Sequence, residues 1–383
     1  MPYNPFVRVL ISAGEASGEM YGAQLMEALR RRDPSLEFFG AGGQRMRDAG
    51  CETVVDSKDL AVVGITEILS HLPKIYGKFH HLIAEADRRR PDVAVVIDSP
   101  AFNWRVARQM RKRAVPVVYY VAPQFWAWRQ GRVRLLRKYV TKALVIFPFE
   151  EKFYRNRGVD AIFVGHPLAE LPHPTVERHA YAAAHKLDAA KHWITLMPGS
   201  RVKEVRLNLP GILESAAQFG RTFEFLLPVA PTLHRGFFEE QISQPGITLV
   251  PESLPALWHS RAGVIASGTA TVEAAMMATP FVMVYRVSGL TYRLGKPRIK
   301  IPRFAMVNLI AGEEVVPELI QDDFTAANVV AWLNRIIPDS AARDVMLEGL
   351  ARVKARLRAG DAVDARPPAD RAAEAVLGLV HKT

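Results

Sequence analysis

The chain has 383 residues and contains a single cysteine, Cys51. One cysteine excludes an intramolecular disulfide and any metal site built from several cysteines, and it favours a reducing cytoplasm. No secretory signal pattern precedes the first predicted strand. The longest uncharged run, Ala114 to Trp128, has 15 residues including two prolines, fewer than the roughly 18 to 20 apolar residues of a membrane-spanning helix. We therefore expect a cytoplasmic protein that does not cross a membrane.

Several nucleotide and metal motifs are also missing. The first loop has neither the GxGxxG dinucleotide pattern nor the P-loop pattern GxxxxGK[ST]. The chain contains no D-x-D and no histidine and aspartate cluster at metal-ligand spacing. No short repeat, low-complexity tract or heptad array is visible. We expect no cofactor and no metal site, so any leaving-group charge must be met by N–H groups and arginine.

The composition that is present indicates a two-domain globular protein with an anionic partner. A hydrophobic content of 49% in 383 residues predicts about two domains with real cores. The net charge of +11, from 50 Lys and Arg against 39 Asp and Glu, favours nucleic acid, an anionic lipid surface or phosphorylated substrates. Charge alone does not choose among these three.

The order of the predicted elements indicates two doubly wound α/β halves. Apolar strand runs alternate with helical spacing up to about Ile162–Val164, and a polar stretch with prolines then follows to about Thr175. The alternation restarts at Ile194, and from Phe324 the pattern is helical. We predict an N-terminal domain at 1–170, a C-terminal domain at 171–345 and C-terminal helices at 346–383 that pack back on the first domain.

The stretch Gly263 to Tyr285 is the most informative one. It predicts a strand, a small polar loop from Ser267 to Thr269, a helix over Thr271 to Ala278 and a second strand. Unpaired N–H groups and the partial positive charge of a helix start suit a diphosphate, and Glu273 can reach a ribose hydroxyl. Helix capping by the same residues explains the pattern equally well.

Two acidic residues are expected at the carboxyl ends of strands in the first domain, where open α/β sheets bind ligands. Asp98 follows the continuous apolar run Asp92 to Ile97, and Glu15 lies in the first loop after Phe6 to Ile11. Asp98 can instead cap the helix that starts near Asn103, and a solvated loop acid is the commoner role for Glu15.

The second domain has a matching loop, Pro198-Gly199-Ser200-Arg201, after a strand at Ile194 to Met197. If the two domains face each other, this loop and the one beginning at Ser267 form a phosphate-binding wall opposite the carboxylates. Arg201 is then the best candidate to stabilise a departing diphosphate.

Two further segments allow alternative interpretations. Leu60 to Leu82 is apolar with interleaved Lys74 and Lys78, which fits a core-facing helix or an interfacial surface for anionic lipid and acyl chains. Phe125 to Trp128 is an aromatic loop followed by a basic helix, which fits a nucleic-acid face. For that helix we favour an ordinary solvated face.

Several sequence blocks together resemble lipid-A-disaccharide synthase, in order and over nearly the whole chain. They are SAGEASGE from Ser12, VVGITEIL from Val62, IDSPAFN from Ile97, YVAPQFWAWR from Tyr120, PFEEKFY from Pro148, VGHPL from Val164, MPGSR from Met197 and SGTATVEAA from Ser267.

The resemblance implies a GT-B glycosyltransferase that joins UDP-2,3-diacylglucosamine to 2,3-diacylglucosamine 1-phosphate and releases UDP. It also implies a peripheral enzyme on the cytoplasmic side of the anionic inner membrane, without nucleic acid as a partner, and we allow for a homodimer. The expected catalytic residues are Asp98 as base, Glu15 and Arg201. The expected donor-binding residues are Gly199, Ser200, Ser267, Gly268, Thr269, Ala270, Thr271, Glu273 and Asn308. For Asn308, the role of a turn residue explains the sequence equally well. The expected acyl or membrane contacts are Val62, Val63, Ile65, Ile68, Leu69, Leu72 and Phe79.

Two positions depart from the family pattern. The opening block commonly ends in Asp where this chain has Glu19, and the IDSP block commonly continues with Asp where this chain has Ala101. Glu19 keeps the charge, whereas Ala101 leaves Asp98 as the one acid of its block.

Two other functions compete with this interpretation. A UDP-sugar epimerase of the GT-B type would have the same phosphate-binding wall but would need no acyl surface. A basic nucleic-acid-binding module explains the net charge but not the Gly and Ser loops at the strand ends. Such a module would bind DNA or RNA in a salt-sensitive way and would have no affinity for UDP.

Overall fold

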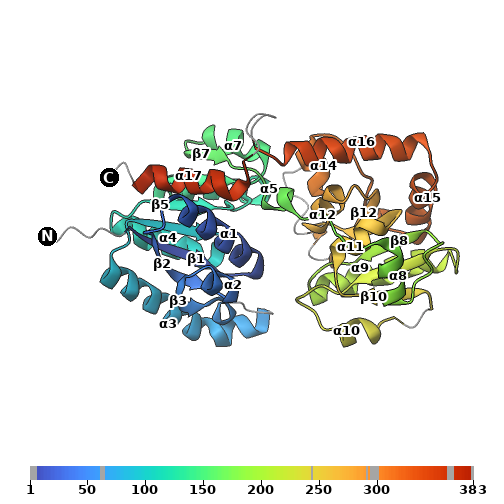
Figure 1. The fold of residues 1–383 in the computed structure, drawn as a ribbon, viewed down its shortest axis with the longest axis horizontal. Coiled ribbons are helices and arrows are strands. Elements are labelled where there is room, and N and C mark those ends of the chain that lie inside the picture. The colour runs from blue at the N-terminus through green and yellow to red at the C-terminus, as the bar shows by residue number, and fades with distance from the viewer. Residues whose placement is uncertain are drawn as a thin grey trace. The chain divides into compact units, whose positions relative to one another are not determined.

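The computed structural model describes residues 7–60, 65–242, 245–289, 292–293, 302–359 and 366–380; the side chains of residues 16, 65–72 and 128 lie outside the description. The chain forms two compact units, shown in Figure 1. Unit 1 comprises Met1–Pro167 together with Arg358–Thr383, and unit 2 comprises Leu168–Leu357. The divisions therefore fall near the predicted positions 170 and 345, with the second one twelve residues later than expected because α16 (Ala341–Arg356) belongs to unit 2.

Unit 1 is built on a seven-stranded parallel sheet with the order β3-β2-β1-β4-β5-β6-β7. Its strands are β1 (Arg8–Ala13), β2 (Glu37–Gly42), β3 (Glu52–Asp56), β4 (Val93–Ile97), β5 (Val117–Tyr120), β6 (Lys142–Val145) and β7 (Ala161–Phe163). Its α-helices within the described residues are α1 (Ala16–Arg32), α2 (Gln44–Asp48), α3 (Ile65–Arg89), α4 (Pro100–Lys112), α5 (Phe125–Trp128), α6 (Val133–Tyr139), α7 (Pro148–Arg155) and α17 (Pro368–Val380).

The C-terminal helix α17 packs against α1 inside unit 1. Asp370 of α17 accepts hydrogen bonds from Arg31 at 3.1 Å and from Arg32 at 2.5 Å, at the end of α1. Ala372, Ala373 and Val376 form the buried side of α17, so small residues allow close packing and the ion pairs fix one end.

Unit 2 contains a six-stranded parallel sheet with the order β10-β9-β8-β11-β12-β13. Its strands are β8 (Trp193–Met197), β9 (Glu224–Pro228), β10 (Ile247–Val250), β11 (Ala262–Ala266), β12 (Phe281–Tyr285) and β13 (Glu318–Ile320). Its described α-helices are α8 (Arg178–His185), α9 (Val202–Ala217), α10 (Arg235–Glu239), α11 (Ser253–His259), α12 (Ala270–Met276), α14 (Met306–Ala311), α15 (Ala326–Ile336) and α16.

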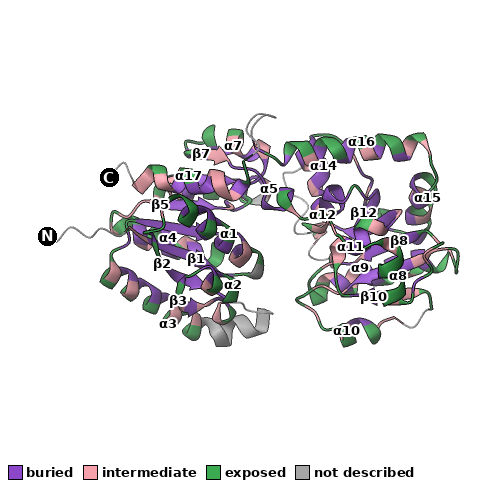
Figure 2. Ribbon diagram, in the orientation of Figure 1, coloured by how far each residue is buried: buried purple, intermediate pink, exposed green. Residues whose placement is uncertain are grey.

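The central strands are apolar and buried on both faces, as Figure 2 shows for both units. All residues of β4 and β11 are buried, which explains why they read as continuous hydrophobic runs. In each sheet the strand order reverses once, between β1 and β4 in unit 1 and between β8 and β11 in unit 2. Ligands of open α/β sheets bind at the carboxyl ends of such strand pairs, which is where the predicted site loops begin.

Candidate active-site residues in each unit

The carboxyl end of β4 has an unusual backbone. Asp98 and Ser99 both have positive φ, 45° and 44°, a left-handed conformation that costs energy for residues other than glycine. The Asp98 N–H donates to the carbonyl of Tyr120 at 3.1 Å, and the Asp98 carbonyl accepts from the hydroxyl of Tyr119 at 2.9 Å. These backbone bonds hold the turn and leave the Asp98 carboxylate available for chemistry.

Asn103 braces this turn and was not among the predicted site residues. Its buried amide nitrogen donates to the carbonyls of Ser12 at 3.1 Å, Ile97 at 2.7 Å and Asp98 at 3.0 Å, and its amide oxygen accepts from the Ser12 hydroxyl at 2.6 Å. Asn103 thereby ties the ends of β1 and β4 together. A polar residue on the buried face of α4, close after the strand end, is the sequence signal that could have identified it.

The environment of Asp98 makes it more basic than an ordinary aspartate. Burial raises the pKa of the Asp98 carboxyl to about 6, and the negative charge of Glu15 also raises it. The hydrogen bond from the Ser99 N–H lowers this pKa and offsets part of the effect. Glu15 itself is exposed and is the N-cap residue of α1. A half-buried carboxylate with a pKa near 6 is mostly ionised at neutral pH and accepts a proton more readily, which suits a general base.

The two departures from the family pattern have different consequences. Glu19 accepts a hydrogen bond from the N–H of Arg45 at 2.7 Å and from the Ser57 hydroxyl at 3.5 Å. A side chain at Gly43 would collide with this carboxylate, since a Cβ there would lie 2.2 Å from an oxygen of Glu19. The Glu19 carboxylate thus supports the start of α2. Ala101 is exposed and brings no charge near Asp98.

In unit 2, the loop between β8 and α9 presents Arg201 to solvent. Gly199 has φ of +124°, and a Cβ there would lie 2.8 Å from that of Glu204, so the turn requires glycine. Glu204 accepts from the Ser200 N–H at 3.3 Å and forms an ion pair with Arg201 at 2.7 Å. The Arg201 side chain is 75% exposed, so the pair orients the guanidinium without burying it.

The loop between β11 and α12 uses some of its predicted donors internally. The Ser267 hydroxyl donates to the Phe304 carbonyl at 2.9 Å, and the Thr271 hydroxyl donates to the Gly268 carbonyl at 2.8 Å. Gly268 has φ of +147°. Within the described residues, the N–H groups of Gly268, Thr269 and Ala270 have no hydrogen-bond acceptor. The loop therefore offers backbone donors, whereas the hydroxyls of Ser267 and Thr271 hold its shape.

Glu273 lies half-buried in the first turn of α12 and accepts a hydrogen bond from the Ser253 hydroxyl at 2.7 Å. Burial raises its pKa, and the Ser253 bond opposes this effect.

The two loops of unit 2 leave neighbouring strands, since β8 and β11 pair directly. Asn208 of α9 is fully buried and connects the first loop to the end of β12. Its amide nitrogen donates to the Pro198 carbonyl at 3.1 Å, and its amide oxygen accepts from the Arg286 N–H at 2.8 Å. Asn208 is a second supporting residue that the sequence interpretation missed.

The prediction that Asn308 contacts the donor is not supported by its surroundings. Its side chain is fully buried and donates to the Val316 carbonyl and the Glu318 carboxylate, both at 2.8 Å. Its oxygen accepts from the N–H groups of Val315 at 2.8 Å and Val316 at 3.0 Å. All its hydrogen-bonding groups are used within unit 2, so Asn308 stabilises the connection between α14 and β13.

The predicted acyl and membrane contacts are only partly described. Val62 and Val63 lie outside the described residues, as do the side chains of Ile65, Ile68, Leu69 and Leu72. Phe79 is a correction, because it is 7% exposed and packs edge-on against Phe102 in the core with ring centroids 6.0 Å apart. The nearby Tyr76 is 64% exposed, so α3 turns one aromatic side chain inward and another outward.

The aromatic loop after β5 packs inside unit 1. Phe125 and Trp126 are buried, and the Trp126 indole donates to the buried carboxylate of Glu150 at 2.7 Å. The N–H groups of Ile146 and Phe147 also donate to Glu150, at 3.2 and 3.0 Å. Burial raises the pKa of Glu150 to about 7 despite these donors. The loop is therefore held by α7, and the two of its rings that the structure describes, Phe125 and Trp126, are not exposed for stacking on bases.

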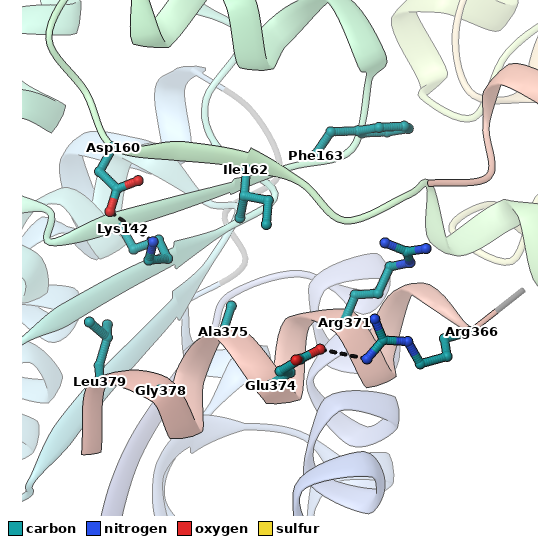
Figure 3. A pocket seen from close by; sticks show the side chains of 10 residues that line it. All are labelled: Lys142, Asp160, Ile162, Phe163, Arg366, Arg371, Glu374, Ala375, Gly378 and Leu379. Atoms are coloured by element: carbon teal, nitrogen blue, oxygen red, sulfur yellow. Dashed lines mark hydrogen bonds and ion pairs between the residues drawn. The ribbon is translucent and has the colours of Figure 1, made fainter. Parts of the chain in front are cut away.

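A cavity of about 470 Å³ lies elsewhere in unit 1, where α17 runs beside β6 and β7. Figure 3 shows the ion pairs Lys142–Asp160 and Arg366–Glu374 among its lining residues. No predicted site residue lines it. Among the residues described, no group of three or more His, Cys, Asp and Glu is arranged to hold a metal ion. No described helix is both long and apolar enough to span a membrane.

The chain matches known proteins over nearly its whole length. A sequence model of the family described as lipid-A-disaccharide synthetase matches residues 9–347. A lipid-A-disaccharide synthase of Koribacter versatilis is 52% identical over 381 residues, which are 98% of this chain and 99% of that protein. A protein of the same name from Geobacter sulfurreducens is 42% identical over 366 residues, covering 94% of this chain and 95% of that protein.

Solved structures with low sequence identity share the fold. The UDP-GlcNAc 2-epimerase of Neisseria meningitidis, bound to UDP-GlcNAc, has a TM-score of 0.63 at 13% identity and covers 99% of this chain and 100% of its own. The calicheamicin glycosyltransferase CalG4 has a TM-score of 0.60 at 16% identity and covers 99% of each chain. Both transferases and epimerases therefore use this architecture, so the fold alone does not choose the reaction.

Proposed function

The chain belongs to the lipid-A-disaccharide synthase family of GT-B glycosyltransferases, and from this premise we propose how its residues divide the reaction. The enzyme takes part in lipid A synthesis and uses a UDP-sugar. Its proposed donor is UDP-2,3-diacylglucosamine and its proposed acceptor is 2,3-diacylglucosamine 1-phosphate. The products are the β-1,6-linked disaccharide 1-phosphate and UDP.

Asp98 of unit 1 is the proposed base. It removes the proton of the acceptor's primary hydroxyl while that oxygen attacks the anomeric carbon on the side opposite the leaving UDP, which inverts the configuration. The observation that supports this assignment is the Asp98 carboxylate itself, which follows a fully buried strand on a strained turn and has a pKa raised to about 6. A positioned base contributes about 10²- to 10⁴-fold to the rate. Glu15 supports the base by raising that pKa.

Unit 2 supplies the proposed donor wall. The backbone N–H groups of Gly268, Thr269 and Ala270 face the diphosphate, with Gly199 and Ser200 shaping the neighbouring loop. Arg201 stabilises the charge that develops on UDP, because an exposed guanidinium held by Glu204 can form bidentate bonds to phosphate. Glu273 accepts a hydrogen bond from a ribose hydroxyl.

The proposed acyl and inner-membrane contact is the segment from Val62 to Leu72. Acylated substrates require an apolar surface, and this stretch is apolar with helical spacing. Phe79 is removed from the contact because it belongs to the core. A homodimer is a further proposal about the assembly, which light scattering of the purified protein tests.

The decisive assay mixes the purified protein with both acylated sugars. The proposal expects equal amounts of UDP and a tetraacyl disaccharide 1-phosphate. Formation of an epimerised UDP-sugar without disaccharide would favour the epimerase alternative. Salt-sensitive binding to nucleic acid without affinity for UDP would instead favour a basic nucleic-acid-binding protein.

A further inference from the structure

Unit 1 contains a long stretch without acidic residues. Asp98 and Glu150 are consecutive acids, and the residues between them include eleven Lys and Arg. This number equals the net charge of the whole chain, +11, so the other Lys and Arg residues balance all of the Asp and Glu residues. The positive excess is therefore concentrated in the segment that forms α4, β5, α5 and α6.

The structure brings many of these cations to one side of the sheet. Helices α4 and α6 pack against each other, and α3 packs against α4. Trp104 of α4 and Tyr139 of α6 meet edge-on with ring centroids 5.2 Å apart. The inner sides of the two helices bury Val106, Met110 and Leu136. Their outer sides carry six exposed cations, which we call the α4–α6 basic face: Arg108, Arg111, Lys112, Arg134, Arg137 and Lys138.

The cations of the α4–α6 basic face have no carboxylate partner among the described residues. Other cations of the same stretch do: Arg113 pairs with Asp87 at 2.5 Å and Lys142 with Asp160 at 2.8 Å. Like charges on adjacent helices repel one another. An external anionic surface would relieve this repulsion.

We propose that the α4–α6 basic face docks on the anionic headgroups of a phospholipid bilayer. The proposal rests on the proposed function, because acylated substrates are held in a bilayer. Lys74 and Lys78 of α3 cannot serve as the main cations, because both form 2.8 Å ion pairs with Asp59. A nucleic acid fits the face less well, since Trp104 and Tyr139 contact each other and offer no ring platform for bases.

Vesicle sedimentation tests this docking without using activity. One variant carries Arg108→Gln, Arg111→Gln and Lys112→Gln, and a second carries Arg134→Gln, Arg137→Gln and Lys138→Gln. The matched control removes three exposed cations of unit 2: Lys186→Gln, Arg221→Gln and Arg335→Gln. Vesicles of phosphatidylcholine with phosphatidylglycerol are compared with phosphatidylcholine alone and with duplex DNA, at low and high salt.

Each lost cation is expected to weaken binding about fivefold, so each triple variant should bind anionic vesicles on the order of 100-fold more weakly than the control. Wild-type binding should require phosphatidylglycerol and weaken at high salt. Variants that sediment like the control would overturn the proposal, as would tighter binding of the wild type to duplex DNA than to anionic vesicles. Melting temperatures of the variants should stay at the wild-type value, because the six side chains are exposed.

Activity on detergent-dispersed substrates separates this proposal from the proposed function. Both triple variants should form disaccharide at the wild-type rate there, because none of the six residues belongs to the proposed catalytic or donor-binding set. A wild-type protein that makes no disaccharide would contradict the proposed function, while the vesicle comparison would still decide the docking surface.

Discussion

The hydroxyl of Ser253 donates a 2.7 Å hydrogen bond to the carboxylate of Glu273, which connects the start of α11 to the first turn of α12. This bond holds a half-buried acid in one orientation beside the loop that begins at Ser267. In the proposed donor wall, Glu273 uses this orientation to accept a second hydrogen bond from the ribose. The same bond favours the ionised carboxylate, against the effect of burial on its pKa.

We predict that Glu273→Ala and Arg201→Ala each weaken UDP binding about tenfold or more. Hydrogen bonds to charged groups contribute roughly 1.5 to 3 kcal/mol each, and about 1.4 kcal/mol corresponds to a factor of ten. Titration calorimetry with UDP measures the effect, and Arg221→Ala, an exposed arginine of unit 2, is the control. Unchanged UDP affinity in both variants would contradict the proposed donor wall.

Asn308→Ala should destabilise unit 2 rather than weaken UDP binding directly. The change removes a buried amide and leaves the N–H groups of Val315 and Val316 without an acceptor, at an expected cost of about 2 to 4 kcal/mol. Urea unfolding gives the free energy. Asn328→Ala is the control, because Asn328 is exposed and its side chain donates only to the Asp323 carbonyl, at 2.9 Å, within the described residues. A stable Asn308→Ala protein with lost UDP affinity would restore Asn308 as a donor contact.

The pH dependence of kcat/KM should show an acidic limb near pH 6. Asp98 must be ionised to accept a proton, so activity rises as the pH increases through its pKa of about 6. Glu15→Gln removes a negative charge that raises this pKa, so its acidic limb should move to lower pH. A limb that stays in place would show that Glu15 does not act on the base.

The double variant Ile68→Ser and Leu72→Ser tests the proposed acyl contact. If these residues face lipid, the protein keeps its melting temperature but loses activity on substrates embedded in vesicles. Loss of folding would instead place them in the core, because buried hydroxyls and cavities destabilise. Activity on detergent-dispersed substrates reports whether the active site remains intact.

The strand order could be anticipated because buried parallel strands are continuous apolar runs. The prediction of Asp92 to Ile97 corresponds to β4 at Val93–Ile97. The apolar run Leu144 to Phe147 likewise predicts a strand, but β6 covers Lys142–Val145, two residues earlier, and Ile146 and Phe147 are buried after the strand ends. The three-residue strand β13 was missed, because a run so short has no periodicity to detect.

The supporting contacts of the site could not be predicted, because they join residues far apart in the sequence. Asn103 reaches back to Ser12, and Lys78 pairs with Asp59, and neither contact follows from a local pattern. Helical spacing in α3 also could not tell which side is inside, so Phe79 was assigned to the wrong surface. Asn308 looked like a turn or ligand residue, whereas its partners at 315–318 define its structural role.

The proposal that Asp98 acts as the base, while unit 2 binds UDP, is tested most directly by Asp98→Asn. Asparagine keeps the shape of the side chain but cannot act as the base, so turnover should fall by about 10²- to 10⁴-fold. The melting temperature above pH 6 should be retained or raised, because a raised folded-state pKa means that the ionised Asp98 destabilises the fold at neutral pH. UDP affinity measured on the same protein should match the wild type. We predict lost turnover with intact folding and UDP binding, and turnover within a few fold of wild type in the folded variant would contradict the role of Asp98 as the base.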